Sequence, residues 1–134
     1  MKEVVQFLQE NPVQYFATVG LDGRPKVRPF QFMLERDGKL WFCTSSQKQV
    51  FAEMGKTPWV EVSVASADFT WLRLSGRPVF VDDLDIKDAI VASSPLVKSI
   101  YGEGKNPIFE AFYLADGKAV LADFTGNPPR EYEL

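Results

Sequence analysis

Hydroxyl and ammonium side chains gather in one short segment, where a predicted strand meets a predicted helix. Thr44, Ser45 and Lys48 follow the apolar run LWFC and coincide with the start of a helix expected over about 47–55. Free backbone N–H groups at a helix N-terminus, flanked by hydroxyls, form a site for phosphate. A bound anion also favours a cation beside it, whereas the helix dipole alone disfavours a lysine in the first turn. The segment therefore points to a site for a monophosphorylated ligand.

The same segment also has a purely structural explanation. Ser46 and Gln49 have the spacing of a capping box, in which each side chain satisfies a backbone N–H of the helix start. A solvated Lys48 in the first turn costs only about 0.3–1 kcal/mol. No Gly-rich P-loop or GxGxxG precedes the helix, which argues against a nucleoside triphosphatase or a Rossmann dinucleotide site. Taken alone, the segment leaves both interpretations open.

A second basic group lies on the strand expected over 25–35. Alternation along GRPKVRPFQF places basic and then aromatic side chains on one face of this strand. These are Arg24, Lys26, Arg28, Phe30 and Phe32. Such a face matches a ligand with a phosphate at one end and a flat ring at the other. The alternative is a solvated strand end followed by core phenylalanines.

The complete absence of histidine limits the chemistry that side chains alone can perform. It removes the Ser-His and Cys-His nucleophilic arrangements in their usual forms, and the commonest transition-metal ligand. A cofactor is then the simplest source of chemistry near neutral pH. The one cysteine, Cys43, excludes an intrachain disulfide and is expected to be a buried small residue rather than a reactive thiol.

Length and charge point to one soluble domain over 1–134. The formal net charge of −3 argues against nucleic-acid binding, and no segment has the length of a signal peptide or a membrane span. We expect a cytoplasmic protein. The acidic set Asp82, Asp83, Asp85 and Asp88 could suggest a metal site, but Asp85 and Asp88 fit a helix cap and first-turn charges better.

Consecutive predicted strands are joined as hairpins, with helices between the hairpins. This order is typical of an antiparallel α+β barrel. Asp22-Gly23, Asp37-Gly38 and Asp116-Gly117 are the expected hairpin turns. The expected helices are 3–10, 47–55 and 85–93, and Ser94-Pro95 is expected to open a short turn that Gly102 stops. The expected strands are 15–20, 25–35, 39–44, 59–65, 70–81 and the two joined at Asp116-Gly117. The tail NPPREYEL could be frayed or could dock on a partner chain.

The order KVRPFQF, DGKLWFCTSSQKQVF, TPWVEVSV and WLRLSGRPVFVDD resembles the pyridoxamine 5′-phosphate oxidase-like family of flavin-binding split barrels. The similarity runs from Pro12 to about Phe124, and it is greatest to the small bacterial, nitroimidazole-resistance-like branch. The resemblance implies an α+β, mainly β fold: an antiparallel six-stranded split β-barrel with peripheral helices. It also implies a homodimer that holds FMN at its interface.

Family residues carry over to this sequence position by position. By this resemblance, the FMN phosphate would be bound by Thr44, Ser45 and Lys48, with Gln49 and Cys43 nearby. Val27, Arg28, Pro29 and Phe30 match the strand that lies along the flavin ring and ribityl chain. Arg28 would add a second contact to the phosphate or donate to the ring.

Two departures narrow the function that the resemblance implies. The chain ends before the arginine-rich substrate-phosphate region of the true oxidases, and it lacks the histidine associated with the nitroimidazole-resistance-like proteins. We therefore expect an FMN-dependent oxidoreductase that exchanges hydride or electrons between a reduced donor and an unidentified small molecule. No catalytic side chain and no metal ligand is named.

Several alternatives stay open at this stage. Trp71 and Arg73 share the strand face opposite the core, so this face is either the substrate side of the flavin or a dimer contact. The protein could also bind flavin without turnover, as an electron carrier, sensor or reservoir. Deazaflavin F420 or haem on the same scaffold is a further possibility.

Overall fold

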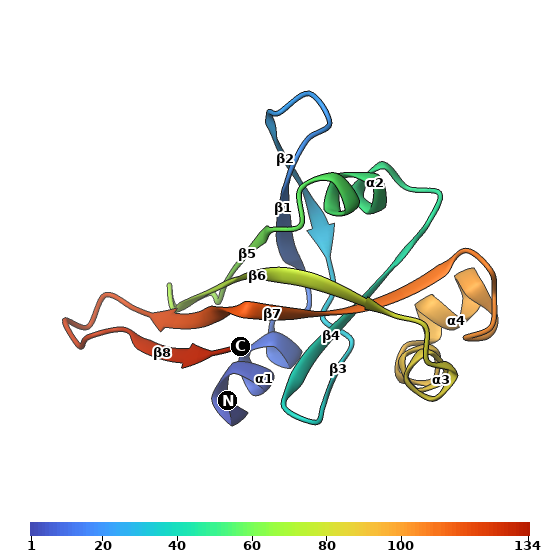
Figure 1. Ribbon diagram of the computed structural model, residues 1–134. Coiled ribbons are helices and arrows are strands. Elements are labelled where there is room, and N and C mark those ends of the chain that lie inside the picture. Colours follow the sequence, from blue (N-terminus) through green and yellow to red (C-terminus); the bar gives the residue numbers. More distant parts are fainter.

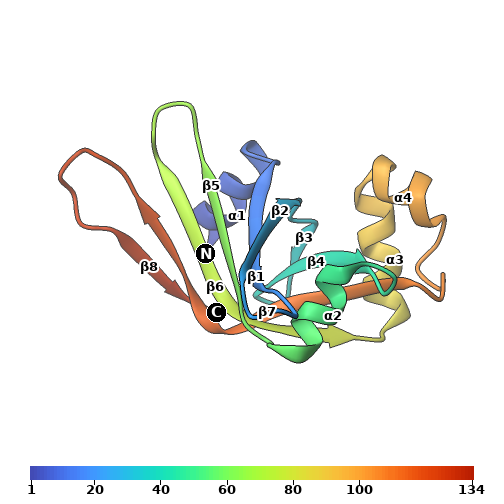
Figure 2. The same cartoon turned by 90° about the horizontal axis from the view of Figure 1, so that it is seen from above.

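The computed structural model describes all 134 residues, and its eight strands form one antiparallel sheet. The strand order is β2-β1-β5-β6-β7-β4-β3, with β8 paired to β7. The strands are β1 (Gln14–Val19), β2 (Pro25–Phe30), β3 (Leu34–Arg36), β4 (Lys39–Ser45), β5 (Val60–Ala65), β6 (Trp71–Val81), β7 (Phe109–Ala122) and β8 (Arg130–Glu133). The sheet curls without closing (Figures 1 and 2), as expected for a split barrel. It has eight strands rather than six, because the short strands β3 and β8 extend it.

Four helices surround the sheet: α1 (Lys2–Glu10), α2 (Gln49–Lys56), α3 (Leu84–Ser93) and α4 (Pro95–Tyr101). The predictions for α1, α2 and α3 are confirmed to within two residues, and the short turn expected from Ser94-Pro95 to Gly102 is the helix α4. Ser94 caps α4 by accepting from the Val97 backbone N–H, and Gly102 ends it at φ 80°. Asp83, rather than Asp85, caps α3. No group of residues could hold a metal ion, and no helix has the length and hydrophobicity that crossing a membrane requires.

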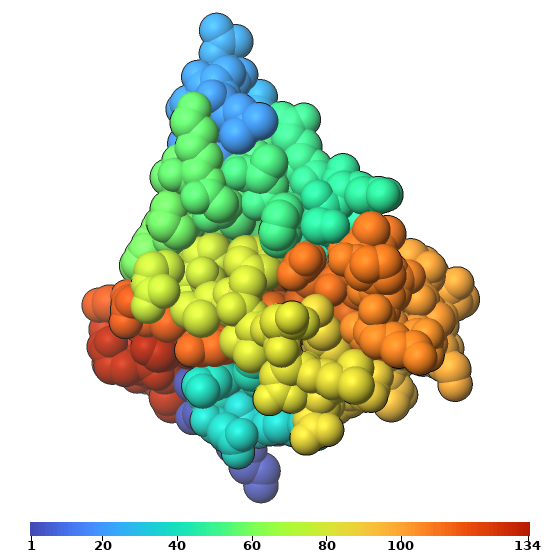
Figure 3. All heavy atoms as spheres, turned by 45° about the vertical axis from the view of Figure 1, so that its right-hand side comes forward, coloured from blue at the N-terminus to red at the C-terminus, as the bar shows by residue number.

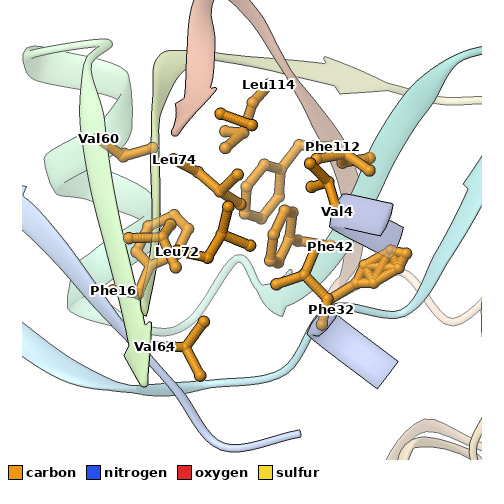
Figure 4. Packing of buried hydrophobic residues seen from close by; sticks show 14 of the residues in the cluster. Val4, Phe16, Phe32, Phe42, Val60, Val64, Leu72, Leu74, Phe112 and Leu114 are labelled. Atoms are coloured by element: carbon orange, nitrogen blue, oxygen red, sulfur yellow. The ribbon is translucent and has the colours of Figure 1, made fainter. Parts of the chain in front are cut away.

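The barrel interior is filled by inward-facing side chains of the strands, and α1 covers one end of it. Phe16, Phe42 and Phe112 are fully buried and pack against one another, while Val4 of α1 completes the cluster (Figure 4). A second apolar cluster lies outside the barrel, where α3 and α4 pack on β4 and β7. Strand alternation along β4 explains the division, because Phe42 faces the barrel and Cys43 faces the helices.

The strand expected over 25–35 is interrupted after Phe30. Strand β2 pairs with β1 and β3 pairs with β4, so the two strands lie at opposite ends of the sheet order. The connecting residues 31–33 cross between them. Along this crossing the Phe32 backbone N–H donates to Gln14 Oε1 at 2.6 Å, and the Met33 N–H donates to the Trp41 carbonyl at 2.9 Å. The alternation of side chains over 25–35 continues without a break, so it gives no sign that the chain changes its partner strand after Phe30.

The expected hairpin at Asp116-Gly117 is wrong. Strand β7 runs straight through this pair, and the register of β6 with β7 shifts between Ser75 and Arg77. Asp116 adopts φ 60°, so one residue of β6 lies opposite two of β7 and the pair forms a β-bulge. Asp37-Gly38, by contrast, forms the predicted turn between β3 and β4, with φ 56° and 74°.

The C-terminal tail is neither frayed nor docked elsewhere in this chain, since β8 pairs with β7 from Leu121 to Lys118. Tyr132 and Leu134 pack against the barrel cluster. Strand β8 lies at one end of the molecule and α4 at the other (Figures 1 and 2). This separation matters for the site, because residues predicted to act together fall at both ends.

Candidate functional site

A groove of about 170 Å³ opens where the end of β2 and the end of β4 meet the start of α2 and the outer face of α4. Five of the residues predicted to bind a cofactor line it: Pro29, Phe30, Cys43, Thr44 and Lys48. These positions are up to nineteen residues apart in sequence. The crossing at 31–33 brings the β2 end next to β4, so the fold assembles the groove from both ends of the sheet.

Lys48 is the only charged residue that lines the groove. Its side chain is exposed and makes no ion pair, and it occupies the N-cap position of α2 rather than the first turn. No side chain caps α2, so the predicted capping box of Ser46 and Gln49 is wrong. The reason lies in the turn before the helix, where Ser45 Oγ accepts from the Gln47 N–H and the Ser45 carbonyl from the Lys48 N–H. Backbone N–H groups of the first helical turn therefore remain available.

Thr44 contributes a buried hydroxyl without a partner. The residue is 2% exposed, and its Oγ1 is the one buried side-chain polar atom that finds no hydrogen bond within the chain. A buried polar atom left unpaired costs about 1–3 kcal/mol. Because Thr44 lines the same groove as Lys48, a ligand with polar oxygens in this groove would fit the residues present.

Arg28 lies on the inward face of β2 and is held by a buried carboxylate. Its Nη2 donates to Glu53 Oε1 at 2.8 Å, and its Nη1 donates to Thr18 Oγ1 at 2.8 Å and to the Phe16 carbonyl at 3.2 Å. The side chain is 25% exposed and is not among the groove residues. The structure therefore compensates the charge of Arg28 inside the barrel, beside the groove rather than in it.

Glu53 is the acceptor that sequence reasoning missed. It is fully buried on α2 and also accepts from Thr18 Oγ1 at 2.7 Å and from Gln49 Nε2 at 3.3 Å. A signal was available, because Glu53 falls on the same buried stripe of α2 as Val50 and Met54. An acid on an apolar stripe calls for a cationic partner. The network joins α2 to β1 and β2 and so fixes the start of α2 relative to the strand β2 that lines the groove.

The remaining predicted cofactor residues lie around the groove but do not line it. Val27 points outward and is 67% exposed, and Gln49 is engaged with Glu53. Ser45 is buried, and its hydroxyl is used by the turn before α2.

Helix α4 supplies a wall of the groove that the sequence analysis did not anticipate. Leu96 and Ile100 expose 63% and 61% of their surface along it, while Val97 and Tyr101 anchor the helix in the outer apolar cluster. The i, i+4 spacing of Leu96 and Ile100 indicates that both apolar side chains share the outward face of this short helix.

Cys43 lines the groove as a neutral thiol. Burial raises the pKa of Cys43 from its ordinary 9.0 to about 12, and the nearby positive charge of Lys48 offsets only part of this effect. Burial also raises the pKa of the neighbouring Tyr101 hydroxyl. Neither group ionises near neutral pH, which agrees with the expectation that Cys43 is not a reactive thiol.

Trp71 and Arg73 lie away from this groove. They border a separate depression of about 440 Å³ on the outer face of β6, β7 and β8. The Trp71 ring is 5.0 Å from the Phe124 ring, and Arg73 pairs with Glu61 at 3.7 Å. Because α4 and β8 are at opposite ends of the molecule, a single chain does not bring Trp71 to the groove of Lys48 (Figure 2).

Comparison with solved structures places this architecture among known relatives. A NimC/NimA family protein from Clostridium acetobutylicum is 30% identical, with a TM-score of 0.90 over 100% of this chain and 92% of that chain. A pyridoxamine 5′-phosphate oxidase-related, FMN binding protein from Nostoc punctiforme is 17% identical, with a TM-score of 0.75 over 97% of this chain and 87% of that chain. A heme binding protein from Mycobacterium smegmatis is 14% identical, with a TM-score of 0.73 over 93% of this chain and 54% of that chain. The last two likenesses show the fold alone.

Sequence comparison agrees with the structural one. No curated protein matches the chain. The model of the pyridoxamine 5′-phosphate oxidase family, however, matches residues 1–122. Together with the relative at 30% identity, this match covers nearly the whole barrel, and the chain belongs to the pyridoxamine 5′-phosphate oxidase family.

Proposed function

We propose that the groove binds FMN, with the phosphate at the start of α2. The observation that carries the proposal is the meeting, in one groove, of an unpaired cation with a buried hydroxyl that has no partner. Lys48 supplies the charge, Thr44 the hydroxyl, and the uncapped first turn of α2 the N–H donors. A phosphate satisfies all three at once.

The apolar part of the groove suits the flat ring of the same ligand. Pro29 and Phe30 form one side, and Leu96 and Ile100 of α4 form the other. Bound flavin would supply hydride or electron transfer between a reduced donor and a small-molecule acceptor, which makes the protein an FMN-dependent oxidoreductase. The chain's own residues bind the cofactor, orient it and exclude water; none is assigned to proton transfer.

A homodimer that completes the site is part of this proposal. The groove of one chain is smaller than the roughly 300–1,000 Å³ typical of ligand pockets. The face of Trp71 and Arg73, which lies far from its own groove, would then belong to the interface or to the partner's substrate side. The FMN binding protein from Nostoc punctiforme shares this fold and supports the choice of cofactor.

Haem and deazaflavin F420 fit the groove less well. The chain has no histidine to act as an axial ligand, and the Cys43 thiol stays protonated near neutral pH. Lys48 is the only cation in the groove, whereas the acidic tail of F420 would require several.

The test is the replacement Lys48→Ala in the full chain. We expect the Kd for FMN to rise about tenfold, equivalent to about 1.4 kcal/mol, while the weaker affinity for riboflavin stays unchanged because riboflavin has no phosphate. Isothermal titration calorimetry measures both. Lys2→Ala removes an exposed lysine from α1, away from the groove, and is the matched control (Figure 1). An unchanged FMN affinity in Lys48→Ala would show that the phosphate does not bind here.

A further inference from the structure

The hydroxyl of Tyr101 has no role in the fold and none in the proposed phosphate site. Tyr101 ends α4, is only 9% exposed and packs its ring against Phe109 with 4.8 Å between the ring centroids. Asn106 Nδ2 donates to the backbone carbonyl of Tyr101 at 2.9 Å, but the hydroxyl takes part in no hydrogen bond within the chain. The ring is thus held in the outer apolar cluster while its one polar atom stays free.

This hydroxyl opens into the groove. Thr44 Oγ1 is the one side-chain oxygen or nitrogen of the chain that is both buried and unpaired. The Tyr101 oxygen is unpaired as well, so it is not shut off from the outside. Because Tyr101 lines the groove, a molecule bound there can reach its O–H group. A tyrosine with a buried ring usually has a partner for its O–H, and here the chain supplies none.

Tyr101 and Lys48 lie in different parts of the groove, with Cys43 close to both. Burial raises the pKa of Cys43 and Lys48 lowers it, whereas the pKa of Tyr101 is raised by burial and by Cys43, with no contribution from Lys48. The segment after α4 meets the segment before α2, where the Ser46 N–H donates to the Ile108 carbonyl at 2.8 Å (Figure 3). A ligand with its phosphate at Lys48 would therefore meet Tyr101 with another of its parts.

The side chains around Tyr101 suit a flat ring better than a hydroxylated chain. Leu96 and Ile100 are exposed on the same helix, and Phe30 of β2 also lines the groove. None of these three can bond to the hydroxyls of a sugar-alcohol chain. A flavin ring, by contrast, packs its faces against apolar groups and presents nitrogen and oxygen acceptors at its edge. A single donor among apolar side chains matches such a ring.

We infer that the Tyr101 hydroxyl donates a hydrogen bond to an acceptor atom at the edge of the flavin ring. The inference rests on the proposed function, because the acceptor atom belongs to the ligand. The hydrogen bond would orient the ring in the groove. It would also favour the reduced ring, whose edge atoms carry more negative charge than those of the oxidised ring. Tyr101 would thereby raise the reduction potential of the bound flavin.

The test is Tyr101→Phe in the full chain, which keeps the ring and its packing on Phe109 and removes only the hydroxyl. We expect the Kd values for FMN and for riboflavin to rise by the same factor, about three- to tenfold, because both ligands contain the ring. Lys48→Ala should weaken FMN alone. Isothermal titration calorimetry measures the affinities. The reduction potential of the bound flavin, measured against a reference dye, should be lower in Tyr101→Phe than in the unmodified protein.

Tyr113→Phe is the matched control. Tyr113 packs in the same outer apolar cluster, but it lines a different hollow, beside Trp41. Its replacement should leave both affinities and the reduction potential unchanged. Neither substitution removes a hydrogen bond of the chain, so both variants should fold as the unmodified protein does.

The outcomes separate this inference from the proposed function. Unchanged riboflavin affinity in Tyr101→Phe overturns the inference, and so does a loss of affinity that is confined to FMN. Weaker binding of both flavins with an unchanged reduction potential would assign Tyr101 to packing alone and would also overturn it. If Lys48→Ala weakens FMN while Tyr101→Phe has no effect, the inference fails and the proposed function stands. If the unmodified chain binds neither flavin, the proposed function itself fails.

Discussion

Three residues at the groove differ from ordinary surface residues in the charge or hydrogen bonding of their side chains. Lys48 is unpaired at a helix start, the Thr44 hydroxyl is buried without a partner, and the Cys43 thiol is held neutral. Arg28, by contrast, is already paired with Glu53, so its charge is not available to a phosphate at the same strength. The positive charge that is available to a ligand in the groove therefore comes from Lys48.

Thr44 offers a prediction in which stability and binding change in opposite directions. Thr44→Val keeps the shape of the side chain and removes the unpaired hydroxyl, so we expect the ligand-free protein to gain about 1 kcal/mol of unfolding free energy. FMN affinity should fall, because the ligand loses its hydroxyl partner. Urea denaturation and calorimetry measure the two effects. A variant that loses stability and keeps its FMN affinity would mean that Thr44 serves packing alone.

Cys43 predicts a pH dependence of stability. Its pKa is about 12 in the folded chain against 9.0 ordinarily, so the folded state retains a proton that the unfolded state releases. The stabilisation is complete below about pH 9 and is lost as pH rises toward 12. Between pH 9 and 11, the unfolding free energy should fall more steeply than in Cys43→Ala, by up to about 1.4 kcal/mol per pH unit. Equal slopes in urea denaturation would refute this account.

At the scale of elements, the groove depends on segments whose partners are distant in sequence. The network of Glu53 with Arg28 and Thr18 ties α2 to β1 and β2, and the crossing at 31–33 places the end of β2 beside β4. These connections fix the spacing between the start of α2 and the strand that faces it.

The bulge in β7 yields a prediction with an internal contrast. A Cβ on Gly117 would lie 1.8 Å from the Ser75 carbonyl oxygen, a contact that only backbone displacement relieves. Gly117→Ala should therefore lower the unfolding free energy by about 2–4 kcal/mol. Gly55→Ala, where nothing lies within 4 Å in the last turn of α2, should raise it by about 0.5–1 kcal/mol. Chemical denaturation of both variants measures the two changes in unfolding free energy. Equal changes would contradict the close contact of Gly117 with Ser75 at the bulge.

Local signals predicted much of this architecture, and the largest errors have a common cause in contacts between segments that are distant in sequence. The Asp37-Gly38 turn and the start of α4 at Ser94-Pro95 are readable because their chemistry is local. Asp116-Gly117 resembles a hairpin equally well, yet β6 continues alongside it and turns the pair into a bulge. The groove residues Thr44 and Lys48 were predicted from the chemistry of a helix start and from the family resemblance, and Pro29 was predicted from the resemblance. The role of α4 as a wall of the groove and the pairing of Glu53 with Arg28 were missed, because the residues that they contact are far away in sequence.

At the scale of the whole molecule, the open sheet carries two separate concave surfaces, one near each end. Helix α4 lies at one end of the molecule and β8 at the other (Figure 2). The groove is lined by α4, and the depression beside Trp71 is lined by residues of β6, β7 and β8. The homodimer proposed above would give these separated surfaces a common location. The predicted roles of Trp71 and Arg73 depend on that assembly, because one chain cannot bring them to its own groove.

The central claim is that this barrel holds a phosphorylated flavin at Lys48 and Thr44. The most direct measurement is an absorbance titration of the purified protein with FMN and, separately, with riboflavin. Tight binding of FMN with binding of riboflavin at least tenfold weaker is the predicted result, since the phosphate contacts carry the difference. Equal affinity for the two flavins, or no binding of either, would contradict the assignment of the groove.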